Sequence, residues 1–159
     1  FIFNELGKPW LTQYWTREIV NSVYAGLSPE LGYNGDEDQG LMGANAVLMK
    51  IGLYQVDGGV SEDPVYQIGS PIFDEIEIQL DDNYYQGDSF LLRTIDNSAT
   101  NKYIERIELN GTAIHRSYLR HSEIVNGGEL TLFMTDEPNT AQTNLDTGPN
   151  SCSARKKRR

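Results

Sequence analysis

The stretch Gly32-Tyr33-Asn34-Gly35-Asp36-Glu37-Asp38-Gln39-Gly40 places three consecutive acidic residues in a glycine-bracketed loop between two segments with a helical pattern. The first segment begins at Pro9, and its apolar residues recur at spacings of three and four, which predicts an amphipathic helix over about residues 9–25. Residues 41–51 after the loop are apolar nearly all round, and Gly52 follows them as a helix C-terminal glycine would. The acids are therefore expected between two helices, at the start of the more buried one.

The acidic loop has two interpretations, which are compatible with one another. In the first, the acids start a helix, because an aspartate at or near the N-cap accepts backbone hydrogen bonds and acids in the first turn complement the helix dipole. In the second, at least one carboxylate is kept ionised and directed at a substrate, in a loop where adjacent acids repel one another. A calcium loop of the EF-hand type is excluded, since Val47 occupies the twelfth position counted from Asp36, where a bidentate Glu is needed.

From about residue 65 the apolar pattern changes from helical to alternating. This alternation predicts antiparallel β structure, in one or two layers of a sandwich. Asn110-Gly111 lies between two strand-like runs and is a strong hairpin signal. The runs that carry the strand prediction are Ile72–Leu80, Phe90–Leu92, Tyr103–Leu109 and Leu130–Met134.

The chain is accordingly predicted to be α+β, with a helical part followed by a β part. The predicted boundaries are 1–57 for the helical part, 58–64 for a glycine- and proline-containing junction, 65–139 for the β part and 140–159 for a disordered tail. Two long helices cannot enclose a cleft of their own, so the helical part needs partners. Because the chain opens at Phe1 without Met or a signal segment, we expect it to be the downstream part of a longer protein.

Composition excludes several classes of function. The 159 residues carry a net charge of −10 although the chain ends in five consecutive basic residues, so a body with a charge of −15 would repel nucleic acid. The basic run at 155–159 has no aromatic partners and is expected to be a solvated tail. No apolar run is long enough to span a membrane. Cys152 is the single cysteine, which rules out a disulfide framework and a thiolate metal site within this chain.

A series of short motifs follows in a fixed order along residues 1–139. The motifs are Asn4–Trp10, Thr16–Ile19, Gly35–Met42, Ile51–Tyr54, Ile68–Asp74, Leu109–Gly111, His121–Gly128 and Glu137–Asn139. Together they resemble the C-terminal part of glycoside hydrolase family 92, the calcium-dependent α-mannosidases. Members of that family have an N-terminal β-sandwich and an (α/α)6 barrel, and they remove terminal α-mannose with inversion at the junction between the two.

The resemblance implies that this chain holds the last helices of the barrel, followed by the C-terminal β segment. It implies that Asp38 is the general base and that Asp36 is its close support or competitor. Calcium is the implied cofactor, with its main ligands and the catalytic acid lying upstream of Phe1. An inverting glycosidase places its two carboxyl groups roughly 6.5–9.5 Å apart, which leaves room for the attacking water. The implied partners are a mannose-containing glycan and the upstream part of the same polypeptide.

One departure from the family concerns the residues after the acidic loop. Many members read Gln-Met-Ser-Ala-Trp-Tyr where this chain has Leu41-Met42-Gly43-Ala44-Asn45-Ala46. The missing aromatic pair bears on linkage preference rather than on the reaction class. The alternative from a different class is a non-catalytic carbohydrate-binding or structural β module whose acidic loop is only a helix cap. By resemblance, the location is secreted, periplasmic or cell-surface.

Overall fold

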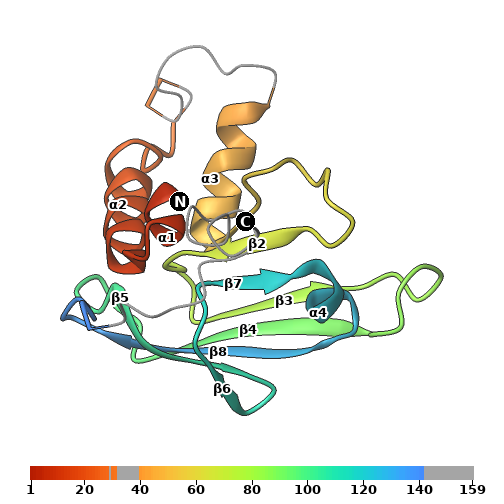
Figure 1. Cartoon of the computed structure of the whole chain (residues 1–159). Helices are drawn as coiled ribbons and strands as arrows, with labels where there is room; N and C mark the ends of the chain where they lie inside the picture. Colours follow the sequence, from red (N-terminus) through yellow and green to blue (C-terminus); the bar gives the residue numbers. More distant parts are fainter. Residues whose placement is uncertain (29, 32–39, 142–159) are drawn as a thin grey trace, which may run out of the picture.

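The computed structural model describes residues 1–28, 30–31 and 40–141, and it places a group of helices beside two β-sheets (Figure 1). The helices are α1 (Ile2–Glu5), α2 (Pro9–Ser22), α3 (Leu41–Ile51) and α4 (His121–Val125). The strands are β1 (Leu53–Tyr54), β2 (Val65–Ile68), β3 (Glu75–Gln79), β4 (Ser89–Ile95), β5 (Tyr103–Leu109), β6 (Thr112–Ile114), β7 (Tyr118–Arg120) and β8 (Gly128–Thr135).

The two long helices begin and end at the residues that their sequence favours. Pro9 is the first residue of α2, where a proline lacks only an N–H that has no helical partner. The helix ends at Ser22, three residues before the predicted end. Gly52 ends α3 with a φ of 79°, a left-handed conformation that favours glycine, so the predicted helix over 41–51 is confirmed at its C-terminus.

Two sheets pack together over a single core. The smaller sheet has the strand order β1-β2-β7 and the larger one has the order β3-β4-β8-β5-β6. Buried apolar side chains from both sheets belong to one cluster, which is the arrangement expected of a sandwich. Its fully enclosed members include Ile68 and Leu119 of the smaller sheet and Phe90, Leu92, Leu130 and Leu132 of the larger one.

The prediction of purely antiparallel β structure is wrong at the centre of the larger sheet. Strand β8 runs parallel to β4, with Leu92 opposite Leu130, and antiparallel to β5, with Ile107 opposite Leu132. The sheet is therefore mixed. Local alternation reports which side chains point inward, and it carries no information on the direction of a partner strand that is about forty residues away.

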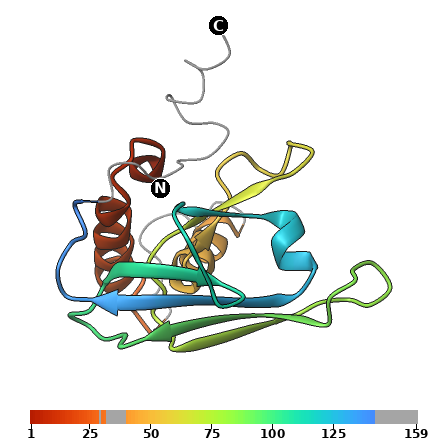
Figure 2. The ribbon, with the colours of Figure 1, turned by 60° about the horizontal axis from the view of Figure 1, so that its bottom comes forward.

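The predicted hairpin at Asn110-Gly111 is confirmed. It joins β5 to β6, and both residues have positive φ, at 51° and 73°, as a type I′ turn requires. Helix α4 was not predicted as a helix, because its five residues are too short for a periodic pattern. In Figures 1 and 2, α2 and α4 lie at opposite ends of the sheets.

Candidate active site and the helices that carry it

The predicted site residues Asp36 and Asp38 lie outside the described residues, and the described positions that flank them are Leu31 and Gly40. Gly40 is the N-cap residue of α3, with a φ of 91°, and no acidic residue occurs in the first turn of the helix. The N-cap and the first turn are thus formed by Gly40, Leu41, Met42 and Gly43, and the interpretation of the acids as residues near the N-cap concerns positions outside the described residues.

Contacts near the loop connect the end of the α2 segment to α3. The Tyr24 hydroxyl donates to the sulfur of Met42 at 3.9 Å, and the Lys50 ammonium donates to the carbonyl oxygen of Tyr24 at 3.4 Å. Tyr24 thus contacts both the first and the last turn of α3. These contacts fix the two helices relative to one another on either side of the acidic stretch.

Helix α2 is attached to the β part through the buried side chain of Arg17. Its Nε donates to the Ser70 hydroxyl at 2.8 Å, and its Nη2 donates to the carbonyl oxygen of Pro71 and to the side-chain oxygen of Asn97. Burial lowers the pKa of Arg17 to about 10, so the guanidinium stays charged at neutral pH. Although Arg17 belongs to one of the family motifs, the sequence carried no signal of this contact.

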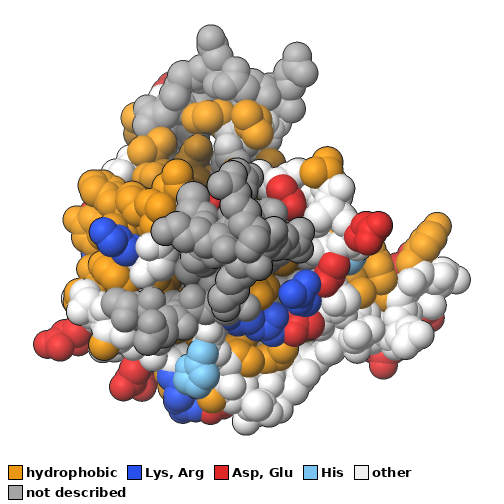
Figure 3. Space-filling view, viewed as in Figure 1, with side chains coloured by type: hydrophobic (Ala, Val, Ile, Leu, Met, Phe, Trp, Pro, Cys, Tyr) orange, Lys and Arg blue, Asp and Glu red, His pale blue; other side chains and the backbone are white. Residues whose placement is uncertain are grey.

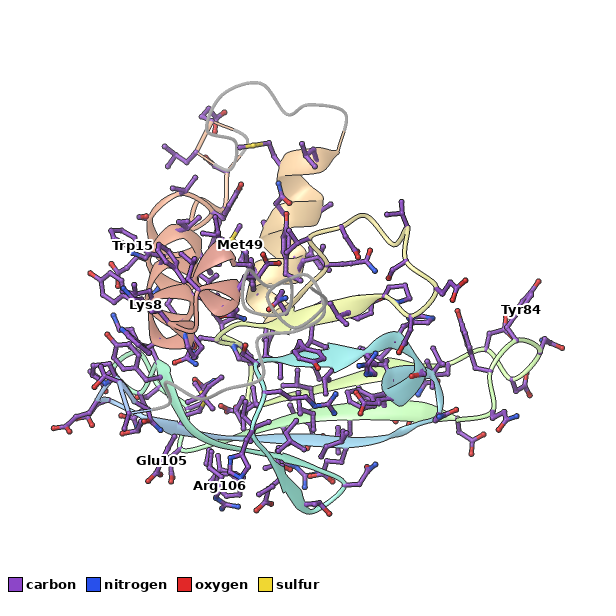
Figure 4. All side chains as sticks on the ribbon, viewed as in Figure 1. Lys8, Trp15, Met49, Tyr84, Glu105 and Arg106 are labelled. Carbon is purple, nitrogen blue, oxygen red and sulfur yellow. The ribbon has the colours of Figure 1, made fainter. Side chains whose placement is uncertain are left out.

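The helices expose an apolar surface. None of the residues of α3 is buried, and Leu41 and Val47 are each 56% exposed. The expectation that α3 is the more buried of the two helices is therefore wrong for this chain, because the buried residues lie in α2. Trp15 is 49% exposed and projects from α2 at the left edge of the molecule in Figure 4, over the area where Figure 3 shows hydrophobic side chains gathered on α1 and α2. A groove of about 410 Å³ beside Trp15 is lined by Phe1, Phe3, Thr12, Thr16, Ile19 and Met49. Apolar surface of this extent is typical of an interface.

The described part of the chain lacks a cluster of side chains that commonly bind metal ions. Within residues 1–28, 30–31 and 40–141 there is no group of three or more His, Cys, Asp or Glu side chains that could hold a metal ion. His115 is exposed, whereas His121 begins α4 and its Nδ1 lies 3.3 Å from the Tyr66 hydroxyl. The described residues therefore offer no cluster of carboxylates of the kind that binds calcium.

A second concavity, which was not predicted from the sequence, lies between α3 and the two sheets. It has a volume of about 310 Å³, and its polar members are Tyr66, Tyr85, His121 and Gln79 among apolar side chains. Burial raises the pKa of Tyr66, and the nearby Tyr85 raises it further, so Tyr66 is a neutral hydrogen-bonding group at physiological pH. The lining is apolar over most of its surface, which suits packing better than catalysis.

A model of the glycosyl hydrolase family 92 catalytic domain matches residues 1–136. The chain belongs to glycoside hydrolase family 92. Among solved family 92 structures, an inverting mannosidase from Bacteroides thetaiotaomicron VPI-5482 is 37% identical, with a TM-score of 0.80 over 95% of this chain and 19% of that one. An α-mannosidase from Bacteroides thetaiotaomicron in complex with mannoimidazole is 29% identical, with a TM-score of 0.80 over 94% of this chain and 19% of that one.

A curated relative of this family 92 chain comes from Arthroderma benhamiae and is described as an uncharacterized secreted glycosidase. It is 28% identical over 160 residues, which cover 99% of this chain and 20% of the relative. The chain therefore spans about one fifth of the length of the relatives that it matches. None of the described helices is long and apolar enough to cross a membrane. The family resemblance of the sequence motifs is confirmed.

Proposed function

We propose that this chain is the C-terminal part of a calcium-dependent exo-α-mannosidase that removes terminal α-mannose from mannosides or N-glycans with inversion. The observation that carries the proposal is the match of residues 1–136 to the family 92 catalytic domain, since that match includes the acidic loop. A similar solved structure is that of an inverting mannosidase, which supports the proposed inversion. The secreted curated relative supports a location outside the cytoplasm, whether secreted, periplasmic or at the cell surface.

In this proposal Asp38 is the general base and Asp36 supports it. Inversion needs an ionised carboxylate that takes a proton from a water molecule on the face of the sugar opposite the leaving group. Gly40 is the N-cap residue of α3, so neither Asp36 nor Asp38 occupies that position. The other half of the reaction, protonation of the leaving oxygen, requires a carboxylic acid from elsewhere in the polypeptide.

The proposed partner of the helical part is the upstream polypeptide. Residues 1–57 would supply the last helices of an (α/α)6 barrel, and 65–139 the β segment that follows the junction at 58–64. The exposed apolar side chains of α2 and α3, including Trp15, Leu41 and Val47, support this, because barrel helices bury such residues against neighbouring helices. Calcium would be held by groups outside the described residues, and chelation with EDTA followed by restoration with CaCl₂ tests its requirement.

The test is substitution of the acids in the full-length protein. Asp38→Asn is expected to lower kcat on an aryl α-mannoside by about 10²–10⁴-fold, with Asp36→Asn costing less. Asp82→Asn, at an exposed turn between β3 and β4, is the matched control and should leave kcat unchanged. Wild-type kcat in the Asp38→Asn protein would refute the assignment of the base. Absence of mannoside hydrolysis by the wild-type protein, combined with glycan binding, would favour the non-catalytic carbohydrate-binding module.

A further inference from the structure

One short segment of the β part, Gly69–Ile72, contacts both of the helices between which the acidic loop lies in the sequence. On the α2 side, Arg17 donates to the Ser70 hydroxyl and to the Pro71 carbonyl oxygen. The Ser70 hydroxyl in turn donates to the carbonyl oxygen of Lys102 at 2.7 Å. The contact of Arg17 is therefore made to a segment that is itself tied to the larger sheet.

On the α3 side the same segment approaches the end of the helix closely. The N–H of Gly69 donates to the carbonyl oxygen of Gly52 at 2.8 Å, and the N–H of Ile72 donates to that of Lys50 at 3.0 Å. A Cβ atom added at Gly52 would lie 2.6 Å from Cγ of Pro71. Such a separation is far below van der Waals contact, so only glycine allows this approach.

The attachment of α2 is made by a cation that has no anionic partner among the described residues. Arg17 is 6% exposed, and no carboxylate of the described part lies within ion-pair distance of it. Burying a charge is costly, and an apolar side chain of similar volume often serves stability as well or better. The guanidinium instead fixes the orientation of α2 on the β part, because its planar group donates to three acceptors at fixed angles.

We propose that Arg17 is a positioning residue for the catalytic base. Arg17 attaches α2 to the segment Gly69–Ile72, and the Gly52–Pro71 contact attaches α3 to the same segment. The two attachments fix the positions of the helices relative to one another, and hence the distance between the two ends of the loop that carries Asp38. The inference rests on the proposed function, and it assigns to Arg17 an effect on the reaction through Asp38. Arg17 is not proposed to touch the substrate.

The test compares Arg17→Lys and Arg17→Met in the full-length enzyme, with an aryl α-mannoside as substrate. Lysine keeps the positive charge but lacks the planar arrangement of N–H donors, and methionine lacks both. The loss in kcat is therefore expected to be smaller for Arg17→Lys than for Arg17→Met. We expect about 10-fold for Arg17→Lys and about 100-fold for Arg17→Met, because a displacement of about 1 Å costs that much, while KM changes little. Arg93→Lys is the matched control, since Arg93 pairs with Glu75 and Glu129 on the exposed face of the larger sheet.

Two further variants separate positioning from stability. Leu92→Ala in the core lowers the melting temperature without removing a hydrogen-bond partner of Arg17, and it should keep kcat at a temperature where it is folded. Asn97→Ala removes one of the three acceptors of Arg17, together with a hydrogen bond of 3.3 Å from Asn97 to the carbonyl oxygen of Phe73, and it keeps the test possible where Arg17→Met does not fold. For Asn97→Ala we expect a fall in kcat of about 3-fold.

The decisive readout is the double variant with Asp38→Asn. If Arg17 acts through the base, Arg17→Lys should cause no further loss of kcat in the Asp38→Asn protein. An equal loss in both backgrounds, or unchanged kcat for the folded Arg17 and Asn97 variants, overturns the inference. Failure of the proposed function itself would look different, because Asp38→Asn would then leave mannoside hydrolysis intact or the wild-type enzyme would show none.

Discussion

The side-chain oxygen of Gln13 accepts a hydrogen bond from the backbone N–H of Ile104 at 3.1 Å, across 91 residues of sequence. Both residues are buried, and the register of β5 against β8 shifts between Ile104 and Arg106. Such a shift disrupts the regular ladder at that point. A polar side chain from α2 therefore completes the hydrogen bonding of the sheet and joins the helical part to the β part.

Replacing Gln13 by Met should loosen this junction. Methionine has a similar volume but leaves the Ile104 N–H buried without an acceptor, which costs about 1–3 kcal/mol in the free energy of unfolding. Urea unfolding measures the total effect, and hydrogen exchange should show faster exchange at the Ile104 amide. Gln79→Met, at an exposed position of β3, is the control and should change neither. Unchanged exchange at Ile104 would mean that the hydrogen bond contributes nothing to the junction.

Glu123 predicts a pH dependence of stability. Burial alone would raise the pKa of Glu123, but hydrogen bonds from Arg116 and from the Arg120 amide outweigh it and hold the pKa below the ordinary value of 4.5. The native state therefore favours the ionised carboxylate, so its stabilisation is present above pH 4.5 and is lost as the pH falls through the lower native value.

Glu123→Gln should thus lower the free energy of unfolding by about 1–2 kcal/mol near pH 7 and have a smaller effect near pH 3. Urea unfolding of both proteins across this range gives the difference. A difference that grows toward low pH would show that the carboxylate is not stabilised in the native state. Glu77→Gln, at an exposed position of β3, controls for the loss of one negative charge.

In the isolated chain 1–159 the helices should be the less stable part. Helix α3 buries none of its residues, whereas strands β4 and β8 carry side chains that are completely enclosed. Native-state hydrogen exchange should show faster exchange for amides of about 9–52 than for those of about 72–134. The reverse order in a monomer would indicate that the helices have a core of their own and are not part of a barrel.

The isolated chain should also be inactive toward α-mannosides. An inverting glycosidase needs an acid that protonates the leaving oxygen in addition to the base, and in the proposed function that acid comes from elsewhere in the polypeptide. Purified 1–159, assayed with CaCl₂, should release no mannose, while the full-length protein assayed in parallel should. Release of mannose by the isolated chain at a comparable rate would show that the chain contains a complete site.

Parts of the candidate site could be predicted from sequence, and parts could not. The helices on either side of the acidic stretch and Gly52 at the end of α3 follow from local patterns, because capping and periodicity depend on neighbours in the chain. The attachment of those helices was not predictable. Arg17 reaches Ser70 and Pro71 across more than fifty residues, and an arginine on an amphipathic helix is ordinarily a solvated residue.

The sequence by itself determined the two long helices, the strands β3, β4, β5 and β8, the hairpin at Asn110-Gly111 and membership of the family. Each of these depends on side-chain period, on backbone preference or on ordered motifs, which are properties of the chain alone. Only the tertiary structure decided the parallel pairing of β4 with β8, the short helix α4 and the burial of Arg17. These depend on which distant segments meet, and a contact between distant residues is selected by the packing of the whole core rather than by local sequence.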